Sequence, residues 1–368
     1  MMKDYKNCTG CMACQAICPK GAIESIPNKE GFYYPHIDLK KCVQCGLCDK
    51  ICAENAVKDE AQISLCVQYK NMDMLLNATS GGAISALAET VLKKNGCVIA
   101  AEYERVDKGA RWVVIESTEQ LKAIQGSKYF QIPINKEIFE DIQKRVPHQL
   151  VLFIGTPCQV DAAKRIIKSN NFVTIDLICG GVASFLLEKA YIDYWTEKTN
   201  SNVIRHLFRK KVDGWTRDYY AYIETDSGVN VTKKGYSDYF NYIYNSGNCF
   251  RESCYNCKFT SLQRVGDFTV GDAWGIDQKD VLEFDTRKGS SLLMINSDKA
   301  YQLFNLMDNL YYIEAKQEII SDNKPLHYTS KRKLMRNMSY NVLSVLPLRL
   351  SALIINYRHT IKILIGRK

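Results

Sequence analysis

The sequence predicts a small α+β module over residues 1–60, a mixed α/β domain over residues 61–330 and a C-terminal tail over residues 331–368. Two copies of one cysteine spacing, separated by short apolar segments, predict the module. Two successive patterns of strand, loop and helix from residue 150 onward predict the larger domain, because this is the order of a parallel βαβ unit. A chain of 368 residues with 46% hydrophobic residues has room for such a packed body.

The repeated cysteine spacing is C-x2-C-x2-C-x3-C. The two copies are Cys8, Cys11, Cys14 and Cys18, then Cys42, Cys45, Cys48 and Cys52. This is the spacing of bacterial two-cluster ferredoxins, in which three cysteines of a run bind one [4Fe-4S] cluster and the fourth binds the other. We therefore assign one cluster to Cys8, Cys11, Cys14 and Cys52, and the second to Cys42, Cys45, Cys48 and Cys18. The module is predicted to be a ferredoxin-like, two-cluster electron carrier.

Structural zinc and disulfides are the alternatives for these cysteines. Zinc sites usually pair C-x2-C with a second pair a dozen or more residues away, and they do not interlock in this manner. Clusters of this kind are kept in the reducing cytoplasm, and the polar start of the chain lacks an apolar signal segment. We therefore expect a cytoplasmic protein whose cysteines bind metal.

The net charge of +9 lies entirely in the tail. Residues 331–368 contain nine basic residues and no acidic one, which leaves 40 basic against 40 acidic residues in the rest of the chain. This distribution argues against a nucleic-acid-binding face. The tail also carries an apolar run over 342–355, too short to span a bilayer, so peripheral contact with the inner face of a membrane is one expectation. A C-terminal helix docked on the body is the equal alternative.

The elements of the module and of the first half of the α/β domain follow from local signals. Short strands and a turn are expected around Ile23, Ile26 and 32–37, and a linker at 59–71. A helix with apolar residues at helical spacing is predicted over 83–92, ending at Asn95 and Gly96. The remaining predictions are strands at 97–103 and 111–116 joined by a turn at 107–109, a short helix to 125 opened by the Ser117 and Gln120 capping box, and a helix over 136–145.

The second half of the domain contains the βαβ unit. We predict a strand at 150–154, a turn at 155–158, a helix at 159–169, a strand at 172–178 and a helix at 184–199. A hairpin near 219–231 and a strand at 268–270 follow. Cys158 and Cys179 then lie in loops at the carboxyl ends of adjacent strands, where open α/β sheets bind ligands.

A second redox site is predicted by Cys249, Cys254 and Cys257, which have a C-x4-C-x2-C spacing. Cys158 or Cys179 could supply a fourth thiolate. The softness of the thiolate ligands and the spacing of the cysteines favour a third iron–sulfur cluster over zinc. Which four of the five cysteines bind it stays open. Cys66 and Cys97 have no such neighbours and are expected in the core.

Three loops have the composition of anion-binding or ligand-binding turns. They are Thr79-Ser80-Gly81-Gly82 at a helix start, Gly126-Ser127-Lys128-Tyr129, and Gly271-Asp272-Ala273-Trp274-Gly275. Free backbone N–H groups at a helix start suit a phosphate. An ordinary capped helix, a surface loop and a packed tryptophan are the respective alternatives.

The order of these motifs resembles one family. The ferredoxin pair, SGGA at 80–83, GSKY at 126–129, GTPCQV at 155–160, DLICGGV at 176–182, CFRESCYNC at 249–257 and GDAWGI at 271–276 together look like the coenzyme F420 hydrogenase/dehydrogenase β-subunit family, in its form with an N-terminal two-cluster ferredoxin. Members are iron–sulfur flavoproteins that bind FAD. One departure is Gly180, where the family often has a histidine. Members are chemically diverse, and some that resemble this chain accompany surface-polysaccharide genes.

The resemblance implies a mixed α/β flavin-binding domain over 61–330. By this resemblance the flavin is surrounded by three segments, which contribute Ser80, Gly81 and Gly82, then Gly126, Ser127, Lys128 and Tyr129, and then Gly155, Thr156, Pro157 and Gln159. We infer Lys128 near the flavin and Trp274 or Tyr129 as a stacking wall. The five histidines fall outside the shared motifs, so no general acid is assigned.

The expected function is therefore that of an iron–sulfur flavoprotein oxidoreductase that moves electrons between [4Fe-4S] clusters and FAD to reduce or oxidise a two-electron, small-molecule substrate. Its partner would be a redox protein or a small electron carrier. One alternative is a non-catalytic electron-delivery subunit for a partner enzyme. Another, which rests on the tail alone, is a scaffold at a membrane surface in polysaccharide assembly.

Overall fold

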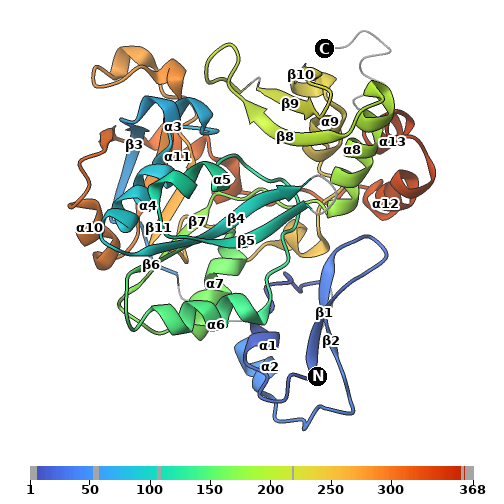
Figure 1. The fold of residues 1–368 in the computed structure, drawn as a ribbon, viewed down its shortest axis with the longest axis horizontal. Coiled ribbons are helices and arrows are strands. Elements are labelled where there is room, and N and C mark those ends of the chain that lie inside the picture. The colour runs from blue at the N-terminus through green and yellow to red at the C-terminus, as the bar shows by residue number, and fades with distance from the viewer. Residues whose placement is uncertain (1–5, 53–57, 106–108, 218, 358–359, 361–368) are drawn as a thin grey trace.

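The computed structural model describes the chain except for residues 1–5, 53–57, 106–108, 218, 358–359 and 361–368. The N-terminal module lies at one end of the molecule, beneath a large central sheet, and a second, smaller sheet lies at the opposite end (Figure 1). Part of the turn expected at 107–109 falls outside the described residues, as do four of the nine basic residues of the tail: Arg358, Lys362, Arg367 and Lys368.

The N-terminal module contains the antiparallel hairpin of β1 (Ile23–Pro27) and β2 (Tyr33–Ile37) and two short helices, α1 (Ala13–Ala16) and α2 (Leu47–Ile51). The strands and turn expected between the cysteine runs are confirmed. The two helices contact each other, and α1 also packs against α6 and α7 of the main body. The module is therefore docked on the body through its first cysteine run.

The central sheet has eight strands in the order β13-β3-β12-β11-β7-β6-β4-β5. Strands β11, β7, β6 and β4 run parallel to one another, whereas the remaining pairs in the sheet are antiparallel. The bounds are β3 (Ile63–Tyr69), β4 (Cys97–Arg105), β5 (Gly109–Ile115), β6 (Val151–Gly155), β7 (Phe172–Leu177), β11 (Phe268–Asp272), β12 (Ser291–Ile295) and β13 (Leu310–Glu314). The predicted parallel βαβ unit is confirmed by β6, α7 and β7.

The segment at 59–71 is not the expected linker, because most of it forms β3. This strand pairs with β12 on one side and β13 on the other, so it is an interior strand of the sheet. Both of its faces are covered: Leu65 and Val67 enter one core cluster, whereas Cys66 enters another. The polar residues Ser64 and Gln68 interrupt the apolar pattern, so the sequence did not predict a strand here. The strand is stabilised only by partners that are distant in the chain.

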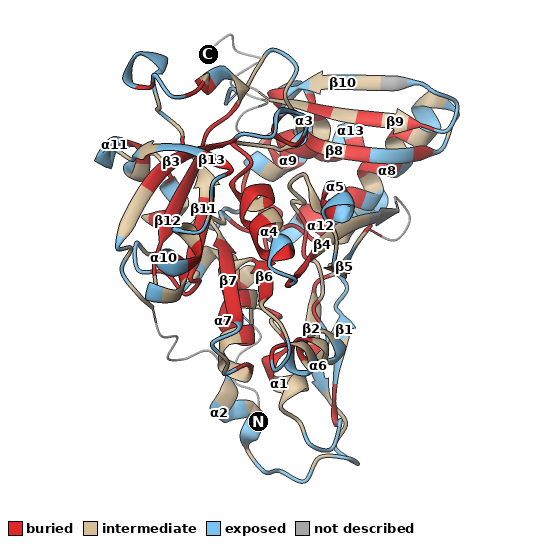
Figure 2. Ribbon diagram, turned by 60° about the vertical axis from the view of Figure 1, so that its left-hand side comes forward, coloured by how far each residue is buried: buried red, intermediate tan, exposed pale blue. Residues whose placement is uncertain are grey.

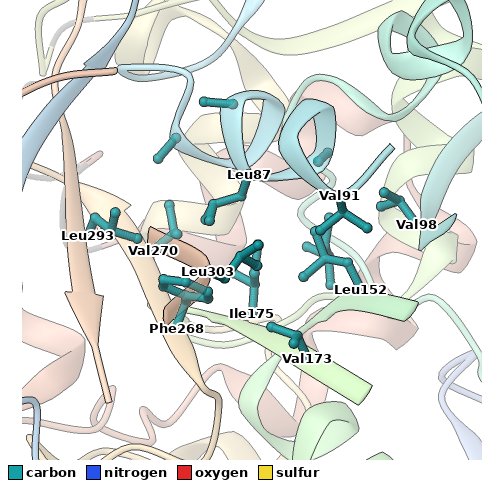
Figure 3. Packing of buried hydrophobic residues seen from close by; sticks show 14 of the residues in the cluster. Leu87, Val91, Val98, Leu152, Val173, Ile175, Phe268, Val270, Leu293 and Leu303 are labelled. Atoms are coloured by element: carbon teal, nitrogen blue, oxygen red, sulfur yellow. The ribbon is translucent and has the colours of Figure 1, made fainter. Parts of the chain in front are cut away.

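Helices cover both faces of the sheet. On one face lie α3 (Met72–Asn77), α4 (Ala83–Lys93), α5 (Leu121–Ile124) and α10 (Asp298–Phe304). On the other lie α6 (Lys136–Arg145) and α7 (Pro157–Ile166). Leu87 and Val91 of α4 point toward Leu152 and Ile175 of the strands in Figure 3. Successive residues of one strand enter opposite core clusters, as Leu152 and Phe153 do. This period of two is what a sheet covered on both faces requires.

A separate core joins the smaller sheet to four helices. This sheet has the order β10-β9-β8, with β8 (Val203–Lys210), β9 (Tyr220–Thr225) and β10 (Asn230–Lys234). It packs with α8 (Phe185–Thr199), α9 (Tyr239–Asn245), α12 (Arg336–Val345) and α13 (Leu348–Ile355) around buried aromatic side chains. The predicted hairpin near 219–231 is confirmed by β9 and β10. Buried residues concentrate in these elements and in the central strands, whereas the far end of the module is exposed (Figure 2).

The first part of the tail is docked on the body. Helices α12 and α13 contact α8 and α9 through Tyr340, Leu348, Ala352 and Ile355, which are all buried. The docked-helix alternative therefore describes residues 336–355. The remaining helical elements of the described residues are α11 (Gln317–Ser321) and six 3₁₀ segments: η1 (Thr118–Gln120), η2 (Gly235–Ser237), η3 (Glu252–Asn256), η4 (Gln278–Asp280), η5 (Thr286–Lys288) and η6 (Lys324–Leu326).

Candidate functional site

A cavity of about 350 Å³ opens at the carboxyl edge of the parallel strands. Residues from the middle of β4 and from the ends of β6, β7 and β11 line it, together with the start of α4, the loop at 124–132 and the cysteine loop after Cys249. Thr9 and Gly10 of the N-terminal module line it as well. The cavity is therefore located where an open α/β sheet binds its ligand, and it reaches the first cysteine run.

Ten of the twelve residues predicted around a flavin line this cavity. They are Ser80, Gly82, Gly126, Ser127, Lys128, Tyr129, Gly155, Thr156, Pro157 and Gln159. Gly81 and Trp274 are not part of the lining. The Gly81 amide donates to Ser291 Oγ at 2.9 Å, and a Cβ at this position would lie 2.3 Å from the Ser291 nitrogen, so Gly81 permits close packing of the loop on β12.

Trp274 belongs to a neighbouring aromatic stack. Its ring lies parallel to that of Trp215 with 4.6 Å between centroids, and the Arg209 guanidinium lies 5.3 Å from its centroid. Arg209 forms a bidentate ion pair with Asp272 and does line the cavity. Of the two proposed stacking residues, only Tyr129 is thus in the cavity wall. The loop expected at 271–275 begins later, because Gly271 and Asp272 end β11.

The start of α4 presents unpaired backbone donors to the cavity. Gly82 is the N-cap in a left-handed conformation with φ 78°, which favours glycine, and no side chain caps the helix. The N–H groups of the first helical turn, at Ala83, Ile84 and Ser85, have no carbonyl partner within the helix, and these three residues line the cavity. Thr79 Oγ1 accepts a hydrogen bond from the Ser127 amide at 3.2 Å, which joins this helix start to the loop at 126–129. This geometry suits an anion.

Two partly buried lysines hold the cavity loops in place. The Lys128 amine donates to the carbonyl oxygens of Ala101 and Ile124, each at 2.9 Å, and burial lowers its pKa to about 8. The Lys211 amine donates to the carbonyl oxygens of Leu75 and Ser80, and burial lowers its pKa to about 7. Lys128 therefore fixes its loop to β4, and its amine is already engaged by backbone carbonyls.

Four of the five cysteines considered for a third cluster line the cavity together: Cys158, Cys179, Cys254 and Cys257. Cys179 follows β7, as predicted. Cys158 lies in the first turn of α7, whereas a loop was expected, because Pro157 takes the N1 position and Thr156 with Gln159 forms a capping box. Cys249 is not in the lining: it is fully buried in the aromatic core of the smaller sheet, and its thiol lies 3.8 Å from the carbonyl oxygen of Ile243.

The four cavity cysteines also influence one another's ionisation. Burial raises the pKa of Cys179 and of Cys254 to about 12. The neighbouring thiol of Cys257 contributes to both of these raised pKa values, and Cys179 and Cys257 both raise the pKa of Cys158. Buried thiols this close to one another stay protonated unless a cation compensates their charge, and coordination to a metal deprotonates them.

Four thiolates are a donor set of the kind that iron–sulfur clusters use. Within the described part of the chain, no three histidine, cysteine, aspartate or glutamate side chains are arranged to hold one metal ion. This holds for the eight cysteines of the N-terminal module as well. A cubane cluster is larger than an ion and spaces its four thiolates more widely, and soft thiolates are the ligands that such clusters use.

The structure brings Cys52 to the first cysteine run. Burial raises the pKa of Cys14 most, and the thiols of Cys11, Cys8 and Cys52 raise it further. This is the grouping that the interlocked assignment requires for one cluster. Cys11 in turn raises the pKa of Cys158, so the two groups of cysteines are neighbours. We call the site of Cys8, Cys11, Cys14 and Cys52 the proximal site, and that of Cys18, Cys42, Cys45 and Cys48 the distal site.

Sequence patterns missed several residues that shape the cavity. Arg264 and Asp176 form an ion pair at 2.8 Å in which both side chains are buried, and Asp176 also accepts from the Gly266 amide at 2.8 Å. This pair ties the segment after Cys257 to β7, which carries Cys179. Arg251 lies inside the CFRESCYNC motif and could have been noticed there, whereas nothing in the local sequence marks Arg209 or Arg264.

The fold, the cavity and the two interlocked cysteine runs define an iron–sulfur protein of the oxidoreductase type, with an N-terminal 4Fe–4S dicluster module and a mixed α/β body. Comparison with family models identifies the family. A 4Fe-4S dicluster domain matches residues 7–56, and the N-terminal and C-terminal parts of the coenzyme F420 hydrogenase/dehydrogenase beta subunit match residues 66–138 and 148–320. The chain belongs to this beta subunit family, as its motifs predicted.

The comparison with solved structures agrees in fold. One similar chain comes from the F420-reducing [NiFe] hydrogenase complex of Methanosarcina barkeri, with 15% identity and a TM-score of 0.50; the match covers 73% of this chain and 91% of that one. No curated protein matches the chain. Within the described residues, no helix has the length and apolar character needed to cross a membrane.

Proposed function

We propose that this protein is an iron–sulfur flavoprotein oxidoreductase that passes electrons between [4Fe-4S] clusters and FAD to reduce or oxidise a small-molecule substrate. One observation carries this proposal: a single cavity is lined both by four cysteines and by an uncapped helix start with two glycine-containing loops. Iron–sulfur ligands and a phosphate-binding start of a helix in one cavity are what an enzyme of this kind needs.

The residues present fit FAD. The α4 N-terminus would hold the phosphates, with Thr79 and Ser127 beside them, because its first N–H groups are unpaired and its dipole favours negative charge. Tyr129 and the apolar ends of the strands would enclose the ring system. When bound, FAD exchanges electrons singly with clusters and in pairs with a substrate. The chain's own groups orient the flavin and exclude water from it.

The cysteines fit a third cluster held by Cys158, Cys179, Cys254 and Cys257, with Cys249 as a core residue. This set lies between the proximal site and the rest of the cavity, since Cys158 neighbours Cys11. Electrons would enter or leave at the distal site, where Cys45 is exposed and apolar side chains reach solvent at Leu39 and Val43. An exposed apolar patch beside a cluster suits a redox partner protein or a small electron carrier.

Anaerobic purification followed by iron, sulfide and flavin quantification tests the proposal. Three clusters of four irons give about 12 irons per chain, with about one FAD. The purified chain should also reduce or oxidise a diffusible two-electron acceptor without another protein. About 8 irons, no flavin and no turnover in protected protein would favour the non-catalytic electron-delivery subunit instead.

We infer a second property from the docked tail, namely peripheral contact with the inner face of a membrane. Helices α12 and α13 bury one side against the body, but their other side exposes Leu350 (50%), Leu353 (47%) and, at the end of α12, Val345 (76%). Apolar side chains at this spacing, close to basic residues of the tail, are typical of interfacial helices.

Flotation with anionic liposomes tests this contact. The wild-type protein should float with the vesicles, and a triple Val345→Ser, Leu350→Ser, Leu353→Ser variant should lose at least about tenfold in bound fraction, because each buried methylene contributes about 0.8 kcal/mol. The exposed Leu282→Ser, far from the tail in sequence, serves as a control. Equal flotation of the triple variant and the wild type would argue for a purely structural tail.

A further inference from the structure

Among the described residues, Arg251 is a buried cation without a carboxylate partner. The described part of the chain has three buried arginines, and two of them are paired: Arg264 with Asp176 and Arg336 with Glu30, each at 2.8 Å. Arg251 is 1% exposed, and its guanidinium donates to the carbonyl oxygens of Cys8 and Tyr33 and to the Gln131 amide oxygen. All three acceptors are neutral, so no partner of Arg251 among the described residues supplies its countercharge.

The nearest candidate for that countercharge is the proximal site. Arg251 Nε lies 2.8 Å from the carbonyl oxygen of Cys8, and Nη2 lies 3.8 Å from its Sγ. A Cβ on Gly10 would lie 3.1 Å from the Arg251 guanidinium carbon, so the loop between Cys8 and Cys11 rests directly on this cation. The φ of +71° at Gly10 and the close Gln131 Nε2, 2.5 Å from the same Cβ position, permit only glycine here.

Arg251 also faces the cavity. It lines the same cavity as Thr9 and Gly10 on one side and Cys254 on the other. The charge therefore stands between the proximal site and the cysteines proposed for the third cluster. The Tyr34 ring covers the guanidinium at 3.9 Å from its centroid, on the side of the N-terminal module.

We propose that Arg251 raises the reduction potential of the proximal cluster by compensating its charge, so that an electron arriving from the distal cluster is held next to the cavity. This rests on the proximal cluster of the proposed function and not on FAD. Reduction by one electron adds one negative charge to a cluster, and a fixed cation at a ligand sulfur in a dry interior stabilises that charge. Arg251 is a tuning residue and binds no metal itself.

Arg251 also joins the module to the body, so the test must separate charge from attachment. Arg336 is a matched control. It is equally buried, its guanidinium carbon lies 5.7 Å from the centroid of Phe32 just as that of Arg251 does, and it joins the body to the module through Glu30. Its charge is already paired with a carboxylate, and no contact joins it to a cysteine thiol of the module within the described residues.

The experiment is an anaerobic redox titration of the full chain, followed by electron paramagnetic resonance of the reduced clusters. The signal that is lost in Cys14→Ser identifies the proximal cluster. In Arg251→Gln, which keeps a donor but loses the charge, the potential of that cluster should fall by at least the 59 mV that corresponds to a tenfold change in a one-electron equilibrium. Arg251→Lys, which keeps the charge, and Arg336→Gln should stay within 59 mV of the wild type.

An unchanged potential in Arg251→Gln would overturn the proposal, as would an equal fall in Arg336→Gln, which would assign the effect to attachment. The iron content of each variant is measured on the same sample, so failure to build the clusters is seen separately. If Arg251→Gln loses iron, the wild-type protein gives a second test. Reduction of the proximal cluster before the distal one supports the proposal, and the reverse order overturns it.

Discussion

Replacing Cys254 with serine is expected to lower the iron content from about 12 to about 8 atoms per chain, while about one FAD remains bound. Serine keeps the size of the side chain but removes a soft thiolate, and a cubane cluster held by three protein ligands is lost readily. Cys254 lies in the cavity wall with three other cysteines, whereas the eight cysteines of the module and the start of α4 do not depend on it. Photoreduced or dithionite-reduced module clusters should then reduce the flavin at least about tenfold more slowly.

The matched control is Cys249→Ser in the same loop. Cys249 is buried in an aromatic core and is outside the cavity lining, so this variant should keep about 12 irons. Iron, sulfide and flavin are quantified on the same anaerobic samples. Loss of four irons in Cys249→Ser with none lost in Cys254→Ser would show that the wrong four cysteines are assigned. An unchanged iron content in both variants would contradict the proposed third cluster.

Replacing Thr79 with aspartate is expected to weaken FAD binding by at least about tenfold, or about 1.4 kcal/mol. The side chain at this position lines the cavity and accepts a hydrogen bond from the Ser127 amide, which a carboxylate can also accept. The new charge would stand at the uncapped start of α4, where the phosphates are proposed to bind. Two like charges about 4 Å apart repel by about 1 to 4 kcal/mol between bulk water and a protein surface.

The Thr79→Asn variant, whose side chain is isosteric with that of the aspartate variant, separates the effect of charge from the effect of shape. Asparagine offers the same oxygen acceptor without the negative charge. The affinity of this variant for FAD should therefore stay within about threefold of the wild-type affinity, which is a smaller loss in binding free energy than the 1.4 kcal/mol of a tenfold change. Flavin release is followed by fluorescence on dilution, and the iron content reports the integrity of each sample. Equal affinity in the aspartate and wild-type proteins would place the phosphates elsewhere, whereas equal losses in both variants would indicate a packing effect.

Local chemistry made much of this fold predictable. The helix at 136–145, the capping box at Ser117 and the alternating strands and helices around residue 172 all follow from short-range pattern. The strand β3 did not, because Ser64 and Gln68 interrupt its apolar residues and its partners β12 and β13 lie more than 200 residues away in the chain. The strand β8 and the core of aromatic residues around it were missed for a similar reason.

In the functional site, too, some features follow from the local sequence and others depend on the packing of distant segments. By itself the sequence determined the two cysteine runs, because ligand spacing is a local property, and the motifs that resemble one family. That resemblance in turn implied the three segments that line the cavity. Only the tertiary structure decided that Cys249 lies apart from the other four cysteines, that Trp274 stacks outside the cavity wall, and that Lys128 is engaged by backbone carbonyls. Tertiary structure alone also placed Arg251, which has no carboxylate partner among the described residues, against Cys8, across a sequence separation of 243 residues. Burial and partnership depend on which distant segments pack together, and spacing along one segment contains no information about that.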